Sequence, residues 1–173
     1  MYGTRVRASI VVAVAALIAL GGCTTAPEPA VTTPTAVPDC AGVAISVSFD
    51  ILGADPINTC ASFSNDEPVT AAEALELVGI TTEGTVEYGT AVICRVNGLP
   101  ASDTPFTVEG EEPYTETCDT MPPAFAYWAL WIKQAGVDEW GYAMEGIDTQ
   151  IVKSGDALGL VFSTGGATPT PEG

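Results

Sequence analysis

The sequence predicts an α+β domain in which one short helix packs on a mostly antiparallel sheet held by two disulfides. Segments rich in β-branched and aromatic residues recur between turn signals, which is typical of short strands. Residues 71–78 are bounded by clear helix start and stop signals. Four cysteines follow residue 23, and such an even set indicates two disulfides in an exported chain.

The first predicted strand, residues 43–51, alternates apolar and small polar residues. Residues 60–68 are interpreted as a loop. The helix follows, with Thr70 as N-cap, Glu73 reaching back to complete a capping box, and Gly79 ending it. We expect this helix to pack across the sheet.

The remaining strands are expected between turns at Gly89, at Asn97-Gly98, at residues 136–139 and at Gly155-Asp156. A long acidic loop, residues 99–117, interrupts them. The predicted strands are 81–88, 91–96, 126–132, 140–144 and 157–162.

Sequential pairing of the cysteines, Cys40–Cys60 and Cys94–Cys118, closes two local loops and ties the acidic loop to a strand. Four cysteines allow two other pairings. A zinc site is the competing interpretation, but the cysteines lack C-x-x-C spacing and the chain has no histidine.

The first residues resemble a bacterial lipoprotein signal. Arg5 and Arg7 precede an apolar run, 8–20, that is shorter than the ~20 residues of a membrane span, and Leu20-Gly21-Gly22-Cys23 resembles a lipobox. We therefore expect lipidation of Cys23. An ordinary signal peptide is the alternative, and it would leave Cys23 as an exposed free thiol.

These signals divide the chain into four expected parts. They are a signal peptide (1–22), a Thr/Pro/Ala-rich tether (23–39), a folded domain (40–164) and a disordered tail (165–173). The tether and the lipid would hold the domain at the outer, extracytoplasmic face of the cell membrane.

Composition excludes several functions. The mature chain has three cations against 22 carboxylates, a formal charge of −19 compared with −17 for the full chain, so nucleic acid is a poor partner. The lack of histidine excludes Ser-His-Asp and Cys-His catalysis. We expect no catalytic residues, no cofactor and no metal.

One group of aromatic residues is the candidate for ligand contact. In a strand, Tyr127 and Trp131 face one way and Trp128 the other, so part of the group must be core. We expect any pocket to lie near the loop closed by Cys118. The full group is Tyr127, Trp128, Trp131, Trp140 and Tyr142.

Charged residues are expected to have structural or solvent-exposed roles. Arg95 should pair with a carboxylate of the acidic loop. That loop region could bind calcium, but it lacks the D-x-D-x-D-G pattern of a dedicated site, so we interpret its carboxylates as solvated. They are Glu109, Glu111, Glu112, Glu116 and Asp119.

Several motifs occur in an order that resembles the transcobalamin-like carboxy-terminal domain family. This domain of unknown function occurs in bacterial exported proteins, and the resemblance is to its actinobacterial lipoprotein branch. The motifs, within residues 43–163, are Ala74-Leu75-Glu76-Leu77-Val78-Gly79, Ile93-Cys94-Arg95-Val96-Asn97-Gly98-Leu99-Pro100, Pro122-Pro123-Ala124-Phe125-Ala126-Tyr127-Trp128-Ala129-Leu130-Trp131, Trp140-Gly141-Tyr142 and Gly155-Asp156-Ala157-Leu158-Gly159-Leu160-Val161-Phe162.

The resemblance implies a small β-grasp-like fold, with one helix on a curved sheet. In vertebrate transporters the same domain closes over a corrinoid held by a separate helical domain. Such a domain is not found in this sequence, and Leu130 replaces a motif tyrosine, so corrinoid binding does not carry over.

Together these features predict a membrane-anchored, non-enzymatic module for ligand capture or protein interaction. Its partner would be a small molecule or an envelope protein. An envelope adhesin or inhibitor domain, with loop 99–117 as the contact, is one alternative. An acidic glycan hydrolase is another, and it would require two carboxylates facing each other across a cleft.

Overall fold

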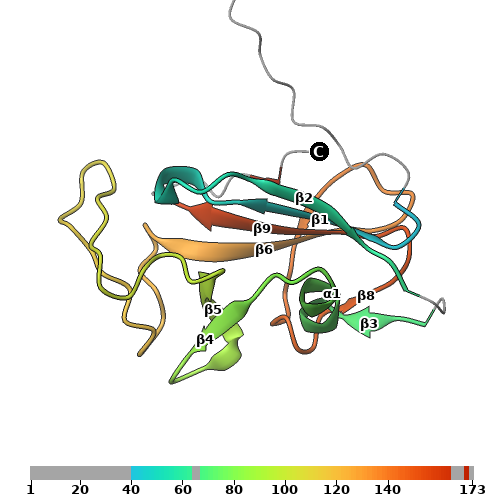
Figure 1. Ribbon diagram of the computed structural model, residues 1–173, viewed down its shortest axis with the longest axis horizontal. Helices are drawn as coiled ribbons and strands as arrows, with labels where there is room; N and C mark the ends of the chain where they lie inside the picture. The colour runs from blue at the N-terminus through green and yellow to red at the C-terminus, as the bar shows by residue number, and fades with distance from the viewer. Residues whose placement is uncertain (1–39, 64–66, 165–169, 172–173) are drawn as a thin grey trace, which may run out of the picture. The chain divides into compact units, whose positions relative to one another are not determined.

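The computed structural model describes residues 40–63, 67–164 and 170–171, which all belong to the second of the chain's two units, Thr33–Gly173 (Figure 1). The predicted signal peptide, Cys23 and the tether lie outside the described residues, and so does the predicted tail except for Thr170 and Pro171. Within the described ranges, no helix combines the length and the apolar character that a membrane span requires.

The described residues form one α-helix, one short 3-10 helix and nine strands, several of only two residues. In chain order they are β1 (Val43–Ser48), η1 (Asp50–Leu52), β2 (Ile57–Ala61), β3 (Val69–Thr70), α1 (Ala71–Leu77), β4 (Thr82–Thr85), β5 (Gly89–Val96), β6 (Tyr127–Lys133), β7 (Gly141–Tyr142), β8 (Ile151–Val152) and β9 (Ala157–Ser163).

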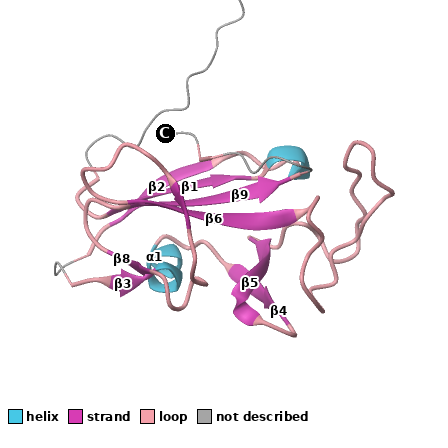
Figure 2. Cartoon of the chain, turned by 180° about the vertical axis from the view of Figure 1, so that it is seen from behind, coloured by secondary structure: helices cyan, strands magenta, loops and turns pink. Residues whose placement is uncertain are grey.

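The main sheet has five strands in the order β2-β1-β9-β6-β7. The last strand, β9, lies between β1 and β6. It runs parallel to β1, and every other pair in this sheet is antiparallel. Two small antiparallel sheets, β3-β8 and β4-β5, complete the described fold (Figure 2). The predicted α+β class, with a β-grasp-like order and one helix, is confirmed.

One face of the main sheet forms the core. Side chains alternate between the faces of a strand, so every second residue of β1, β6 and β9 points toward α1. Figure 1 shows α1 on this side of the sheet. The buried residues of this face include Val43, Ile45, Val47, Trp128, Leu130, Leu158, Leu160 and Phe162, and α1 adds Ala71, Ala74 and Leu75.

The helix begins as predicted. The Thr70 hydroxyl accepts a hydrogen bond from the Glu73 N–H at 3.2 Å, and a Glu73 carboxylate oxygen accepts from the Thr70 N–H at 2.8 Å. Val78 is the C-cap, so the helix ends one residue earlier than predicted. Gly79 follows with φ 75°, a left-handed conformation that glycine adopts without strain.

Both predicted disulfides are present. Cys40–Cys60 joins the segment that precedes β1 to β2, and Cys94–Cys118 joins β5 to the end of the acidic loop. The Asn97-Gly98 turn is also present: both residues have positive φ, and Val96 and Leu99 exchange backbone hydrogen bonds across it.

Some strand bounds differ from prediction. Residues 57–61 form β2 although their sequence, INTCA, does not alternate between apolar and polar residues. They form a strand because their backbone pairs with β1. The predicted strand 43–51 ends at Ser48 because the chain turns into η1. The predicted strand 140–144 is reduced to Gly141–Tyr142.

Candidate functional site

A groove with a volume of about 770 Å³ lies beside β6, and we call it the β6 groove. Its walls come from β5, from the segment that follows Cys118, from β6 and from the segment that follows β7. The lining residues are Thr90, Ala91, Val92, Ile93, Met121, Pro122, Ala124, Tyr127, Trp128, Leu130, Tyr142, Ala143, Glu145, Gly146, Ile147 and Ser163.

The groove exists because the pairing of β6 with β7 is short. β7 pairs only with Trp131 and Ile132, and the Ala143 N–H donates to the Leu130 carbonyl at 2.8 Å. The chain then leaves the sheet edge and crosses to β5. There Gly146 packs so closely that a Cβ would lie 2.5 Å from the Ala91 Cα. Only glycine fits this contact.

The departure of the chain leaves part of the β6 backbone without a partner. Since the Leu130 carbonyl points away from β9, the N–H and C=O of Trp128, two residues earlier, point the same way. No described residue forms a backbone hydrogen bond with Trp128 on that side. The groove therefore has, along one wall, a strand edge whose N–H and C=O have no backbone partner among the described residues.

Trp128 is mainly a core residue. Its side chain is 7% exposed, its ring meets Phe49 and Phe162 edge-on at 5.5 and 5.4 Å, and its Nε1 donates to the Leu99 carbonyl at 3.2 Å. The groove lies next to the segment that follows Cys118, where a pocket was expected, but the tryptophan that lines it is buried.

Two tyrosines border the groove with Trp128. Tyr142 lies opposite Trp131 in the sheet, their ring centroids are 5.2 Å apart, and its side chain is half exposed. Burial, together with the neighbouring Tyr127 phenol, raises the pKa of Tyr142 above its ordinary value of 10.0. Its hydroxyl thus stays protonated at neutral pH.

The other two predicted contact residues lie elsewhere. The ring of Trp140 lies 5.0 Å from the Lys133 ammonium group, a cation–π contact outside the groove. Trp131 is on the face of β6 opposite Trp128. The groove lining therefore brings together Tyr127, Trp128 and Tyr142. Trp131 lies outside the lining but packs against the Tyr142 ring, and Trp140 lies outside it as well.

Most groove-lining residues from β5 and from residues 145–147 were not predicted. Val92 and Ile93 are ordinary apolar strand residues, and the sequence offers no sign that they face a groove. Among the described lining residues the only carboxylate is that of Glu145. The lining is otherwise neutral and mainly apolar.

Arg95 was predicted to pair with a carboxylate of the acidic loop. It pairs instead with Glu83 on the neighbouring strand β4, with 2.8 Å between Arg95 Nη1 and Glu83 Oε2. Its remaining bonds reach the loop's backbone: Nε donates to the Pro100 carbonyl at 2.9 Å and Nη2 to the Glu116 carbonyl at 2.5 Å. The prediction was wrong about the partner because strand pairing places Glu83 directly opposite Arg95. Arg95 is 6% exposed, and its guanidinium joins both ends of the loop.

The acidic loop is only partly solvated. Glu109, Glu111 and Glu112 are exposed, as expected. Glu116 is buried instead, and its carboxylate accepts hydrogen bonds from the Tyr114 hydroxyl at 3.0 Å and the Cys118 N–H at 2.6 Å. It is a structural residue of the loop.

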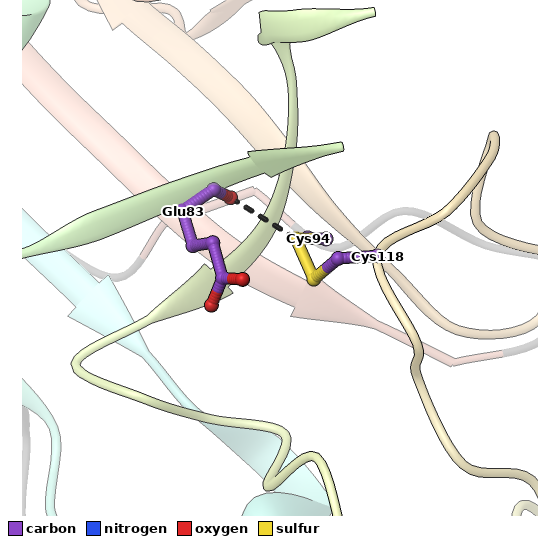
Figure 3. A group of neighbouring side chains, drawn as sticks. All are labelled: Glu83, Cys94 and Cys118. Atoms are coloured by element: carbon purple, nitrogen blue, oxygen red, sulfur yellow. Dashed lines mark hydrogen bonds between the residues drawn. A yellow bond between two sulfur atoms is a disulfide. The ribbon is translucent and has the colours of Figure 1, made fainter. Parts of the chain in front are cut away.

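Glu83 approaches the sulfurs of Cys94 and Cys118, the grouping drawn in Figure 3. Both sulfurs belong to the disulfide, so neither is a thiolate ligand, and the Glu83 carboxylate is engaged by Arg95. The dashed line in Figure 3 joins the Cys94 Sγ to the Glu83 carbonyl oxygen at 3.2 Å; a disulfide sulfur has no proton to donate, so this is a close contact. The donor set does not suit a metal.

Of the arrangements described, the β6 groove combines volume, apolar lining and free backbone groups, and it is the candidate binding site. Comparison of the chain with family models, curated proteins and solved structures finds no match.

Proposed function

We propose that this protein is a lipid-anchored, extracytoplasmic capture module, without enzymatic activity, that binds an extended peptide segment in the β6 groove. The observation that carries this proposal is the unpaired edge of β6 at Trp128, which faces a groove of about 770 Å³. This volume lies within the roughly 300–1,000 Å³ of typical ligand sites.

A peptide fits this groove better than a compact ligand. A peptide that lies antiparallel to β6 can exchange two backbone hydrogen bonds with Trp128 and so add a strand to the sheet. Alternate side chains of the peptide would then contact either Leu130 and Ile147 on the core side or Tyr127 and Tyr142 on the other side.

The single lining carboxylate favours binding over glycan hydrolysis. Both hydrolytic mechanisms use two carboxyl groups that flank the scissile bond. Glu145 has no second carboxylate beside it among the described lining residues. Its negative charge, and that of the whole chain, favour a peptide with a basic residue next to its apolar segment.

The binding test begins with peptides selected from a random display library on the full-length chain. Ala124 lines the groove and is exposed, so Ala124→Arg fills the groove without disturbing the core; Ala41→Arg, at an exposed position outside the groove, is the matched control. We expect Ala124→Arg to weaken a selected peptide by about tenfold or more, a loss of about 1.4 kcal/mol, and Ala41→Arg to leave affinity unchanged.

Methylation of the peptide backbone tests strand addition directly. N-methyl groups at the positions that face β6 should abolish binding, whereas N-methyl groups at the alternate positions should not. Equal effects at all positions, or unchanged affinity of Ala124→Arg, would refute capture by strand addition.

The lipid anchor rests on the Leu20-Gly21-Gly22-Cys23 pattern and the proline-rich tether. Metabolic labelling with a radioactive fatty acid, followed by membrane fractionation, tests it. Labelled protein should sediment with membranes, and Cys23→Ser should be unlabelled; a labelled Cys23→Ser variant would overturn the assignment. Membership of the transcobalamin-like family, proposed on its motifs, is compatible with a binding role but does not specify the ligand.

A further inference from the structure

A row of four residues crosses the outer face of the main sheet, opposite the core. Ser46 of β1 pairs with Gly159 of β9, Gly159 pairs with Trp131 of β6, and Trp131 pairs with Tyr142 of β7. Directly paired residues point to the same face of a sheet. The two aromatic rings therefore lie beside a glycine, which leaves a slot at the centre of the sheet.

Pro171, near the end of the chain, occupies this slot. A Cβ on Gly159 would overlap the Pro171 ring and would lie 3.4 Å from the Trp131 Cβ, so the proline fills the space that the glycine leaves beside the tryptophan. Pro171 is buried.

The Trp131 indole supplies a second, independent observation. Its Nε1 is buried and has no hydrogen-bond partner among the residues that the structure describes. A buried donor without an acceptor is uncommon in folded proteins and calls for an explanation. Pro171 lies on the same surface and leaves this donor unpaired, whereas a longer extended proline-rich segment offers further carbonyl oxygens that are not bonded within the segment.

We propose that Trp131, Tyr142 and Gly159 form a binding site for proline-rich segments, and that the C-terminal Thr170-Pro171 is its intramolecular occupant. Aromatic grooves bind polyproline II segments because those segments are already extended and lose little entropy on binding. The site lies on the opposite face of the sheet from the core, and it does not depend on peptide capture in the β6 groove.

The test measures binding of a fluorescent peptide with the chain's own C-terminal sequence, Ala-Thr-Pro-Thr-Pro-Glu-Gly, to the full-length chain. In the unmodified chain the attached C-terminus competes at an effective concentration of order millimolar, so we expect little binding of micromolar peptide. Pro171→Gly should open the site and raise the affinity by about tenfold or more. A peptide with both prolines replaced by alanine should not bind.

Two further variants separate docking from a change of fold. In the Pro171→Gly chain, Trp131→Phe replaces the indole by a smaller ring that covers less of the proline, and it should weaken the peptide severalfold. Gly159→Ala should block binding. The Trp131 indole resonance in a nitrogen–proton NMR spectrum should shift between the unmodified and Pro171→Gly chains. Absence of that shift, failure of the Pro171→Gly chain to bind, or equal binding of the alanine peptide would each overturn the proposal.

Discussion

Replacement of Arg95 by methionine tests whether the buried guanidinium holds the acidic loop on the domain. Methionine retains most of the apolar stem, so the change mainly removes the charge and its hydrogen bonds. The carbonyls of Pro100 and Glu116 then lose their donor while they remain largely covered.

The magnitude follows from these contacts. Each hydrogen bond to a charged group contributes about 1.5–3 kcal/mol, and leaving a buried acceptor unpaired costs about 1–3 kcal/mol. The Glu83 side chain is 56% exposed, so its ion pair adds less than about 1 kcal/mol. We expect Arg95→Met to lower the free energy of unfolding by about 3–5 kcal/mol, a large fraction of the roughly 5–15 kcal/mol of a typical domain.

Equilibrium unfolding in urea, followed by circular dichroism with the disulfides intact, provides the measurement. Lys153→Met removes an exposed cation and should change stability by no more than about 0.5 kcal/mol. Glu83→Gln should cost less than about 1 kcal/mol. A loss below about 1 kcal/mol for Arg95→Met would refute the reasoning, and an equal loss for Glu83→Gln would assign the energy to the ion pair instead.

Three other changes have definite expected outcomes in the same unfolding assay. Thr70→Ala should lower the free energy of unfolding by about 1 kcal/mol at neutral pH. Hydrogen bonds from the Thr70 backbone and side chain lower the pKa of Glu73, so the effect of the substitution should shrink as the pH falls below 4.5. An effect that stays constant with pH would contradict the capping role. Burial and the Glu116 carboxylate raise the pKa of Tyr114 to about 12, so the free energy of unfolding should fall between pH 10 and about 12. Tyr114→Phe should flatten this decline. If the decline is unchanged in Tyr114→Phe, other groups cause it. Replacing Cys94 and Cys118 by serine opens a loop with a sequence separation of 24 and should cost about 3.5 kcal/mol in the chain-entropy model; a loss near zero would mean that the loop is held by other contacts.

The elements that local chemistry specifies were predictable from sequence. The capping box, the Asn97-Gly98 turn and both disulfides each depend on a few neighbouring residues or on cysteine spacing. Strand β2 was not predicted, since its regularity comes from pairing with β1 rather than from its own residues.

The candidate site was only partly predictable for the same reason. Aromatic residues in a strand indicate that some will be buried and some will face outward, but the sequence does not show where the neighbouring strand stops. The groove depends on the chain leaving β6 after Ala143 and on the contact of Gly146 with Ala91, two long-range features. The partner of Arg95 was mispredicted because register, rather than proximity in sequence, places Glu83 beside it.

The central position of β9 has a consequence for how the protein is made. Ser46 in β1 has its parallel partner at Gly159, so the middle of the sheet stays open until more than a hundred further residues have been synthesised. Such long-range pairing is slow to form, and the incomplete sheet exposes apolar strand edges in the meantime. The main sheet can therefore be completed only after β9 has become available to pair with β1.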